Sequence, residues 1–416
     1  MTGMKVRIHR GAKEVGGNCV EVEAAGARIV LDAGRPLGAG RNDVIPLPNV
    51  AGFGTADDSL LGVLISHGHQ DHWGLIGQVP QRVPVYIGEA ANRILRAAAF
   101  FDAGIKLQPT GFLGHRKTFE LGPFVITPFL NDHSAFDTYS LLVEAEGKRL
   151  FYSADLQAHG RKSSRFEAFL RNPPQRVDVL LLEGTNLRAD GDPKRGLTER
   201  ELEEQLVRVI KDAQGIVLAM YPAQNIDRLV TWFRACLKSR RTLVLDLYGA
   251  TVAEATGNKK IPQYGFRKLL IYVAQRQRIR VKESKQFPRV NRIKPSRIFP
   301  EDLAPRAKEL VLTFRESMIR EIERAGCLTG ATVVYSQWPG YLEPPGSKQL
   351  RAFVKRHDLR LIKLHASGHA YVEDLQRLTE ALAATRIVPI HSWAPNRFTE
   401  FFDGVELHDD GEWWEV

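Results

Sequence analysis

The chain has 416 residues, 44% hydrophobic and 25% charged, as is usual for a globular protein with a large core. No apolar run reaches membrane-spanning length, no apolar leader opens the chain, and the three cysteines form no CxxC pair. We therefore expect a cytoplasmic protein without a membrane span, a disulfide framework or a cysteine-based zinc site. The net charge of +10 is compatible with a nucleic-acid partner but does not require one.

Short β-branched segments separated by glycine-rich turns fill the first part of the chain, and their spacing predicts stacked sheets. One helix is expected among them, over Ala90–Ala99. The strands expected here are Cys19–Ala24, Arg28–Asp32, Leu61–Ser66, Val85–Ile87, Phe124–Phe129, Tyr139–Glu144 and Arg149–Ser153.

After residue 200, helical and strand-like segments alternate, which is typical of a parallel α/β unit. The helices expected are Glu199–Ala213, Asn225–Lys238 and Ala304–Glu323, and the strands are Gly215–Met220, Arg241–Tyr248 and Thr332–Ser336. Further strands follow at Arg360–Leu364, Arg386–Ile390 and around Val405 and Trp413. We predict a β-rich α/β body, residues 1–195 and 359–416, interrupted by an α/β insertion of residues 196–358.

One segment of the insertion concentrates positive charge. Its basic residues are opposed by Glu283 alone, and they are Arg276, Arg278, Arg280, Lys282, Lys285, Arg289, Arg292, Lys294 and Arg297. The segment is either a solvated face or a track for a polyanion. A site for phosphodiester cleavage elsewhere in the chain would favour the track.

Three histidines fall within six residues, in Ser66-His67-Gly68-His69-Gln70-Asp71-His72, directly after a buried-looking strand. At a strand end His67 and His69 project to the same side, so both can bind one ion, while Asp71 and His72 can serve a second. Imidazole and carboxylate are the ligands that zinc prefers when cysteine is absent. The pattern therefore predicts a metal-binding loop.

This loop resembles the second motif of the metallo-β-lactamase superfamily, and the other motifs follow in the expected order. Asp32 matches the first-motif aspartate, which supports the site without ligating, and His133 and Asp155 match the third-motif histidine and the bridging aspartate. The resemblance implies an αββα sandwich with two zinc ions, which manganese or magnesium can replace. It assigns His67, His69 and His133 to one zinc ion, and Asp71 and His72 to the other, with Asp155 between them; Asp71 is also taken as catalytic.

Three later segments resemble the additional motifs of β-CASP nucleases. Glu183 would be motif A, His369 in His365-Ala366-Ser367-Gly368-His369 motif B, and His391 motif C, closing the second metal site. The insertion would then be the β-CASP domain. We assign His369 as the general acid, oriented by Glu183, because the leaving sugar oxygen needs a proton. Asp32 is expected to fix the tautomer of a ligand histidine.

The segment Ala223–Arg228 resembles the loop and helix start of the ribonuclease J branch, and the histidine of motif C favours RNA over DNA. The resemblance thus implies a zinc-dependent ribonuclease with 5′ exonuclease activity, endonuclease activity or both. Its expected partner is single-stranded RNA. We expect the substrate phosphate to be held by His365, Ser367, Gly368 and Asn225, and the RNA backbone by Arg276, Arg278, Arg280 and Lys282.

Two departures leave parts of this assignment open. Gln224 stands where ribonucleases J carry serine, and Glu183-Gly184-Thr185 stands where they carry aspartate-serine-threonine, so recognition of a 5′-monophosphate stays open. The chain ends at Val416, so we do not expect the extra C-terminal domain of many ribonucleases J or assembly through it. Dimerisation by another face stays open, as do three other functions: a DNA nuclease of the same superfamily, a small-molecule metallo-hydrolase and a non-catalytic RNA-binding subunit.

Overall fold

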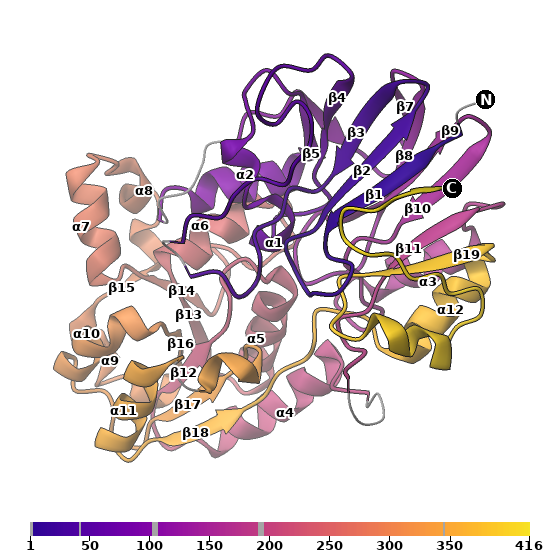
Figure 1. Ribbon diagram of the computed structural model, residues 1–416. Coiled ribbons are helices and arrows are strands. Elements are labelled where there is room, and N and C mark those ends of the chain that lie inside the picture. Colours follow the sequence, from indigo (N-terminus) through magenta and orange to yellow (C-terminus); the bar gives the residue numbers. More distant parts are fainter. Residues whose placement is uncertain (1–2, 41–42, 102–106, 190–194, 344–345) are drawn as a thin grey trace. The chain divides into compact units, whose positions relative to one another are not determined.

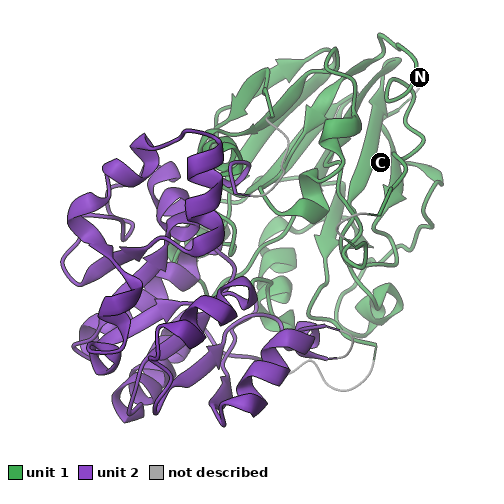
Figure 2. Ribbon diagram, turned by 90° about the vertical axis from the view of Figure 1, so that its left-hand side faces the viewer, with its two compact units in different colours: residues 1–96, 105–195, 368–416 green, residues 97–104, 196–367 purple. Residues whose placement is uncertain are grey.

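The computed structural model describes residues 3–40, 43–101, 107–189, 195–343 and 346–416. The chain forms two compact units, coloured separately in Figure 2. The first unit comprises residues 1–96, 105–195 and 368–416, and the second comprises residues 97–104 and 196–367.

The first unit contains two sheets with one core between them (Figure 1). One sheet has the order β20-β1-β2-β3-β4-β5-β6, and the other has the order β19-β11-β10-β9-β8-β7. The strands of the first sheet are β1 Lys5–Arg10, β2 Cys19–Ala24, β3 Ala27–Leu31, β4 Leu60–Leu64, β5 Val85–Gly88, β6 Gly111–Leu113 and β20 Trp413–Glu415. Those of the second are β7 Phe119–Leu121, β8 Phe124–Leu130, β9 Tyr139–Ala145, β10 Lys148–Tyr152, β11 Val179–Glu183 and β19 Arg386–Ile390.

The alternation of side chains along β11 shows how the layers form, because successive residues of a strand face opposite sides of its sheet. Val179 and Leu181 enter the core between the sheets, which Ile29 and Leu31 of β3 also enter. Leu180 and Leu182 face the other way and pack with the helices α3 (Ser163–Arg171) and α12 (Val372–Leu382), which lie beside β11 and β19 in Figure 1.

A helix also covers the outer face of the first sheet. Ala91 and Leu95 of α2 (Glu89–Ala98) pack against Val30 of β3 and Val63 of β4. The order helix, sheet, sheet, helix confirms the predicted αββα sandwich.

The second unit is built on one sheet with the order β15-β14-β13-β16-β12-β17-β18, in which every pairing is parallel. Its strands are β12 Val217–Met220, β13 Thr242–Asp246, β14 Leu269–Tyr272, β15 Arg297–Ile298, β16 Leu310–Thr313, β17 Thr332–Tyr335 and β18 Arg360–Lys363. Its helices are α4 Glu199–Asp212, α5 Ile226–Lys238, α6 Leu247–Ala255, α7 Gln275–Glu283, α8 Pro288–Asn291, α9 Pro300–Leu303, α10 Ile319–Arg324 and α11 Lys348–Arg356. No helix in the described ranges is long and apolar enough to span a membrane.

Apolar cores lie on both faces of this sheet. Val217 and Ala219 of β12 pack with α4, α5 and α6 on one face, and Leu218 and Met220 pack with α10 and α11 on the other. The strands therefore read as continuous apolar runs, as expected for a parallel sheet that is covered on both sides. The second unit is a three-layer α/β structure.

Two predictions for this region are wrong. The helix predicted over Ala304–Glu323 contains β16, whose apolar run Leu310–Thr313 is buried on both faces and therefore has no helical period. The strand predicted over Arg360–Leu364 belongs to the second unit and not to the final part of the first domain, because β18 pairs in parallel with β17. The second unit accordingly extends to residue 367, whereas the predicted insertion ended at residue 358.

A fully buried arginine joins distant segments of the second unit. Arg228 of α5 donates hydrogen bonds to Glu199, to the backbone and hydroxyl oxygens of Ser336, and to the Ala366 carbonyl, at 2.6–2.9 Å. Because an unpaired buried charge is costly, these contacts fix the segment at Ala366 against the end of β17.

Candidate metal centre

The histidine-rich loop follows β4, and its carbonyl groups are held by two other segments of the first unit. The loop enters the short helix α1 (Gln70–Trp73), where the Asp71 carbonyl accepts from the Asn18 backbone N–H at 3.1 Å. The His72 carbonyl accepts from the Ala33 N–H at 2.8 Å, and the Gln70 carbonyl accepts from the Arg35 N–H at 3.0 Å. The loops after β1 and β3 thus set the position of the predicted ligands.

Four predicted ligands form the first group, in which one ligand atom from each lies within 4.8 Å of the others. They are His67, His69, His133 and Asp155. His133 Nε2 lies 3.2 Å from His69 Nδ1, and Asp155 Oδ2 lies 3.6 Å from His67 Nε2. The 3.2 Å separation allows a hydrogen bond between the two rings, and the four ligand atoms are close enough together to hold one cation.

The second group consists of Asp71, His72 and His391, whose ligand atoms also lie within 4.8 Å of one another. His391 Nε2 lies 3.6 Å from Asp71 Oδ2. The carboxylate of Asp155 lies between the groups, because its Oδ2 is 3.2 Å from His72 Nε2 while its Oδ1 accepts from His391 Nδ1 at 2.6 Å. The structure therefore brings together all seven side chains that the sequence predicted as ligands.

Unsatisfied polar atoms indicate what these groups hold. Among the described residues, His67 Nε2, His72 Nε2, His391 Nε2 and Asp155 Oδ2 are buried and make no hydrogen bond. Buried polar atoms in folded proteins nearly always have a partner. Imidazole nitrogens and carboxylate oxygens converging in a buried site fit divalent metal ions, which would supply the missing partner.

Asp32 holds the outer nitrogen of His72. A carboxylate can only accept, so the Nδ1–H of His72 donates to Asp32 Oδ2 at 2.7 Å and the Nε2 lone pair is left for the metal. The hydroxyl of Tyr152 donates to the same oxygen at 2.7 Å and accepts from Asn18 Nδ2 at 3.1 Å. Ser66 donates its backbone N–H and its hydroxyl to Asp32, at 2.7 and 2.8 Å.

Tyr152, Asn18 and Ser66 were not among the predicted site residues. Because the Ser66 hydroxyl donates to Asp32, its oxygen is left to accept from His67 Nδ1, 3.0 Å away. Asp32 thus orients His72 directly and His67 through Ser66. Asn18 and Tyr152 are 134 positions apart in the sequence, so no local sequence pattern identifies this hydrogen-bond network.

The backbone is strained at both ends of the site. Asp32 has a φ of +62° and His391 a φ of +53°, a left-handed conformation that side chains other than glycine rarely adopt. Non-glycine residues in this region cost about 1–3 kcal/mol and persist where the surroundings fix them. Here the hydrogen bonds to His72 and Asp155 do so.

The pKa values of the histidines differ between the two ligand groups. Burial lowers the pKa of His67 and that of His133, which favours the neutral imidazole that a metal ligand requires. Burial opposes protonation of His391 too, but the neighbouring Asp155 carboxylate raises its pKa to about 10. Burial opposes ionisation of Asp155, yet His391 and His72 hold its pKa well below the usual range.

The predicted acid lies beside this site. His369 Nδ1 is 3.4 Å from Glu183 Oε2 and 3.9 Å from Asp155 Oδ2. Asn186 Nδ2 donates to the His369 carbonyl at 2.7 Å. Burial lowers the pKa of His369, but Glu183 and Asp155 raise it more, so the net shift is upward. The structure thus brings the predicted acid and its orienting carboxylate together.

The predicted phosphate-binding residues divide between the units. Gly368 belongs to the first unit, where its carbonyl accepts from His133 Nδ1 at 2.7 Å. His365, Ser367 and Asn225 belong to the second unit. The Asn225 side chain accepts from the Arg228 N–H at 2.8 Å and caps α5, so its oxygen already has a partner.

The four residues of the predicted RNA track lie on α7, and a helix does not present them as one row. Residues four apart share a face, so Arg276 is grouped with Arg280, and Arg278 with Lys282. Arg276 and Lys282 are exposed, whereas Arg280 lies over the Phe100 ring, with its guanidinium carbon 5.7 Å from the centroid. The spacing of two in the sequence would suit a strand instead.

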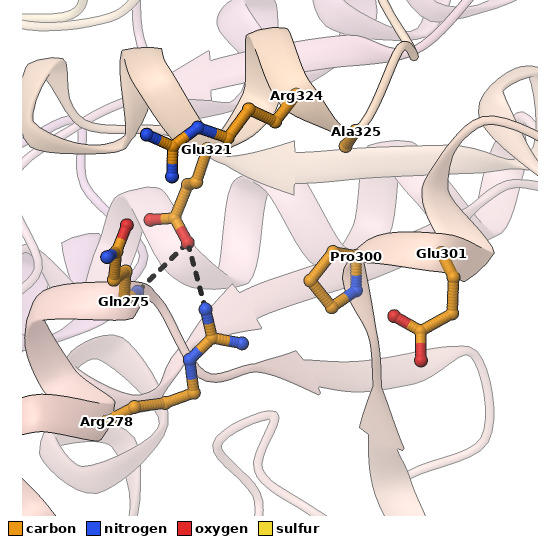
Figure 3. A pocket seen from close by; sticks show the side chains of 7 residues that line it. All are labelled: Gln275, Arg278, Pro300, Glu301, Glu321, Arg324 and Ala325. Atoms are coloured by element: carbon orange, nitrogen blue, oxygen red, sulfur yellow. Dashed lines mark hydrogen bonds and ion pairs between the residues drawn. The ribbon is translucent and has the colours of Figure 1, made fainter.

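Arg278 lines a pocket of about 420 Å³ in the second unit (Figure 3). Glu321 lies inside this pocket and accepts from the Tyr272 hydroxyl and the Gln275 backbone N–H, both at 2.9 Å. Arg324 and Glu301 also line it, so two positive and two negative side chains offset each other. The pocket therefore provides no net attraction for a phosphate.

The chain is similar to several known proteins. Residues 28–217 match the β-lactamase superfamily domain. The chain is 24% identical over 256 residues to a ribonuclease J of Helicobacter pylori, covering 58% of this chain and 36% of that protein. It is 21% identical over 404 residues to a ribonuclease J of Mycoplasma genitalium, covering 93% and 67%. An RNase J-like protein of Methanocaldococcus jannaschii is 21% identical, with 58% and 57% covered.

The matches to the Helicobacter pylori and Methanocaldococcus jannaschii proteins thus span only about a third and a little over half of those proteins. Among solved structures, a protein of unknown function from Enterococcus faecalis has a TM-score of 0.77 at 20% identity, with all of both chains covered. This likeness extends the agreement in fold to the whole chain.

Gly34 provides a test of how the metal loop is held. A Cβ atom at this position would lie 1.8 Å from the Asp71 carbonyl oxygen, so Gly34→Ala must displace the backbone between the two groups of ligands. We expect a loss of stability of about 1–3 kcal/mol, the usual cost of overpacking, and weaker metal binding. Urea unfolding and metal analysis after dialysis measure the two effects.

Gly38→Ala is the matched control, because nothing lies within 4 Å of a Cβ atom at Gly38. Equal metal content in both variants and the parent would contradict the claim that metal binding by the loop requires glycine at position 34.

Proposed function

We propose that this chain, which belongs to the metallo-β-lactamase superfamily, is a zinc-dependent ribonuclease that hydrolyses RNA phosphodiester bonds. The observation that carries the proposal is the pair of ligand groups, in which Asp155 of the first group also contacts His72 and His391 of the second. Sequence similarity to ribonucleases J supports RNA as the substrate class. The three cysteines are free and buried, which suits a protein of the reducing cytoplasm.

Two zinc ions fit the two groups. His67, His69 and His133 would hold one, Asp71, His72 and His391 the other, and Asp155 would contact both. When bound, a pair of such ions neutralises phosphate charge and supplies hydroxide near neutral pH. Asp32, Ser66 and Tyr152 keep the ligand nitrogens aimed inward, which preserves the site's geometry.

His369 would provide the proton for the leaving sugar oxygen. Its Nδ1 faces the Glu183 carboxylate, which orients the ring and favours its protonated form. Glu183 is itself fixed, because its Oε2 accepts from the Thr185 N–H at 3.0 Å. Glu183 would therefore act on the reaction through the position of His369.

RNA binding would add contacts outside the metal groups. His365, Ser367 and the backbone at Gly368 remain our candidates for holding a substrate phosphate, while the capping role of Asn225 reduces what its side chain can contribute. On α7, the exposed Arg276 and Lys282 are better suited to phosphate contacts than Arg278 and Arg280. Such contacts provide affinity without reading sequence.

The first experiment compares labelled single-stranded RNA and DNA of the same sequence, each incubated with the purified protein with and without a chelator. We expect metal-dependent cleavage of RNA and little cleavage of DNA. A circular RNA and 5′-monophosphorylated and 5′-triphosphorylated linear RNAs distinguish endonuclease from 5′ exonuclease activity. Cleavage of DNA alone would instead support the DNA nuclease, and no cleavage of either would overturn the proposal.

If His69 binds a metal ion and His369 donates a proton, replacing each by alanine should have different effects on metal content and on cleavage. His69→Ala removes a ligand and should lower both metal content and cleavage. His369→Ala should keep the metal and slow cleavage by roughly 10²–10⁴-fold, the usual contribution of a general acid. Metal analysis of the same preparations that are assayed measures both, and loss of metal from the His369 variant would refute this division.

The exposed cations of α7 predict a change in salt dependence. Each phosphate contact with single-stranded nucleic acid contributes about 0.7 to the slope of log affinity against log salt. Replacing both Arg276 and Lys282 by alanine should lower that slope by roughly 1.4. The control replaces Lys348 and Lys355, two exposed lysines of α11, which changes the net charge equally. Equal slopes in both double variants would identify the α7 cations as a solvated face.

A further inference from the structure

One tryptophan lacks the intramolecular contacts that the others have. Trp73 donates to the Gly68 carbonyl at 3.0 Å, Trp232 lies beside Tyr221, Trp338 packs edge-on against Tyr341, Trp413 lies under Arg7, and Trp414 stacks on His408. Trp393 has no hydrogen bond, ring contact or cation over its indole anywhere in the described residues. It is also 57% exposed.

The backbone around Trp393 is nevertheless held firmly. His391 donates its N–H to the Gly11 carbonyl at 2.8 Å and accepts from the Gly184 N–H at 3.4 Å. On the other side, the Ala394 N–H donates to the buried Ser392 hydroxyl at 3.1 Å. The indole is thus an exposed group on a fixed loop.

This loop starts at a predicted metal ligand. Trp393 is two positions after His391, so the Cα atoms of these residues are at most roughly 7 Å apart. The His391 ring contacts Asp155, and the Gly184 that packs against Ser392 directly follows Glu183. The backbone of Trp393 therefore lies close to that of a predicted metal ligand, in the unit that would cleave the phosphodiester.

We propose that Trp393 stacks against a base of single-stranded RNA next to the cleaved phosphodiester, an inference that rests on the proposed function. A phosphate held by the two ligand groups brings its adjoining nucleotides to the neighbouring surface. Their bases present flat apolar faces, and stacking on an aromatic side chain accepts every base type. An unpartnered indole on a fixed loop suits this contact, because little further order is lost on binding.

The test measures KM for a short single-stranded RNA with Trp393→Ala, Trp393→Phe and Trp338→Ala. Losing one base–aromatic stack should raise KM by roughly 5- to 150-fold in Trp393→Ala, and Trp393→Phe should recover most of the loss. Trp338 is the matched control, because it is 50% exposed but lies in the second unit, and its removal should leave KM unchanged. Metal content should equal that of the parent in all three variants.

A second measurement identifies the stacked base. Abasic nucleotides placed one at a time along the RNA should raise KM at one position beside the cleaved bond, and Trp393→Ala should add nothing further there. Additive effects at every position, or an unchanged KM in Trp393→Ala, would overturn the stacking. Failure of the proposed function is distinguishable, since the parent would then cleave bis(p-nitrophenyl) phosphate, which has no base, but not RNA.

Discussion

The carboxylate of Asp155 is the interaction on which the site depends. It is buried, one oxygen accepts from His391 at 2.6 Å, and the other lies 3.2 Å from His72 and 3.6 Å from His67. A buried negative charge is stable only when cations or donors surround it. The two sheets of the first unit supply these groups from strand ends that are far apart in the sequence, so the sandwich and the site are built together.

The sequence predicted the part of this arrangement that is local. His67, His69 and His72 fall within six residues, and that spacing is enough to indicate a metal loop. The spacing of short β-branched segments likewise indicates stacked sheets, whereas the αββα order of the layers is implied by the resemblance to the metallo-β-lactamase superfamily. The remaining ligands were identified through family motifs, because nothing local shows that His391 reaches Asp155 across 236 positions.

The features that the sequence did not predict are long-range hydrogen bonds and a strand whose short apolar run is ambiguous. Tyr152 supports Asp32 from another sheet, and Arg228 joins Glu199, Ser336 and Ala366, contacts that only the folded chain creates. The short run of β16 falls inside a predicted helix, because four apolar residues buried on both faces carry no period that distinguishes a strand from a buried helix segment. The two units also differ in chemistry: the first holds the ligand groups and Trp393, and the second holds the cations of α7.

The central claim is that two groups of side chains, with one carboxylate between them, bind two metal ions. Anomalous diffraction recorded at the zinc absorption edge, from crystals of the protein prepared without chelators, tests it most directly. We expect two peaks, one among His67, His69 and His133 and the other among Asp71, His72 and His391, with Asp155 between them. A single peak, or no peak at these residues, would contradict the claim.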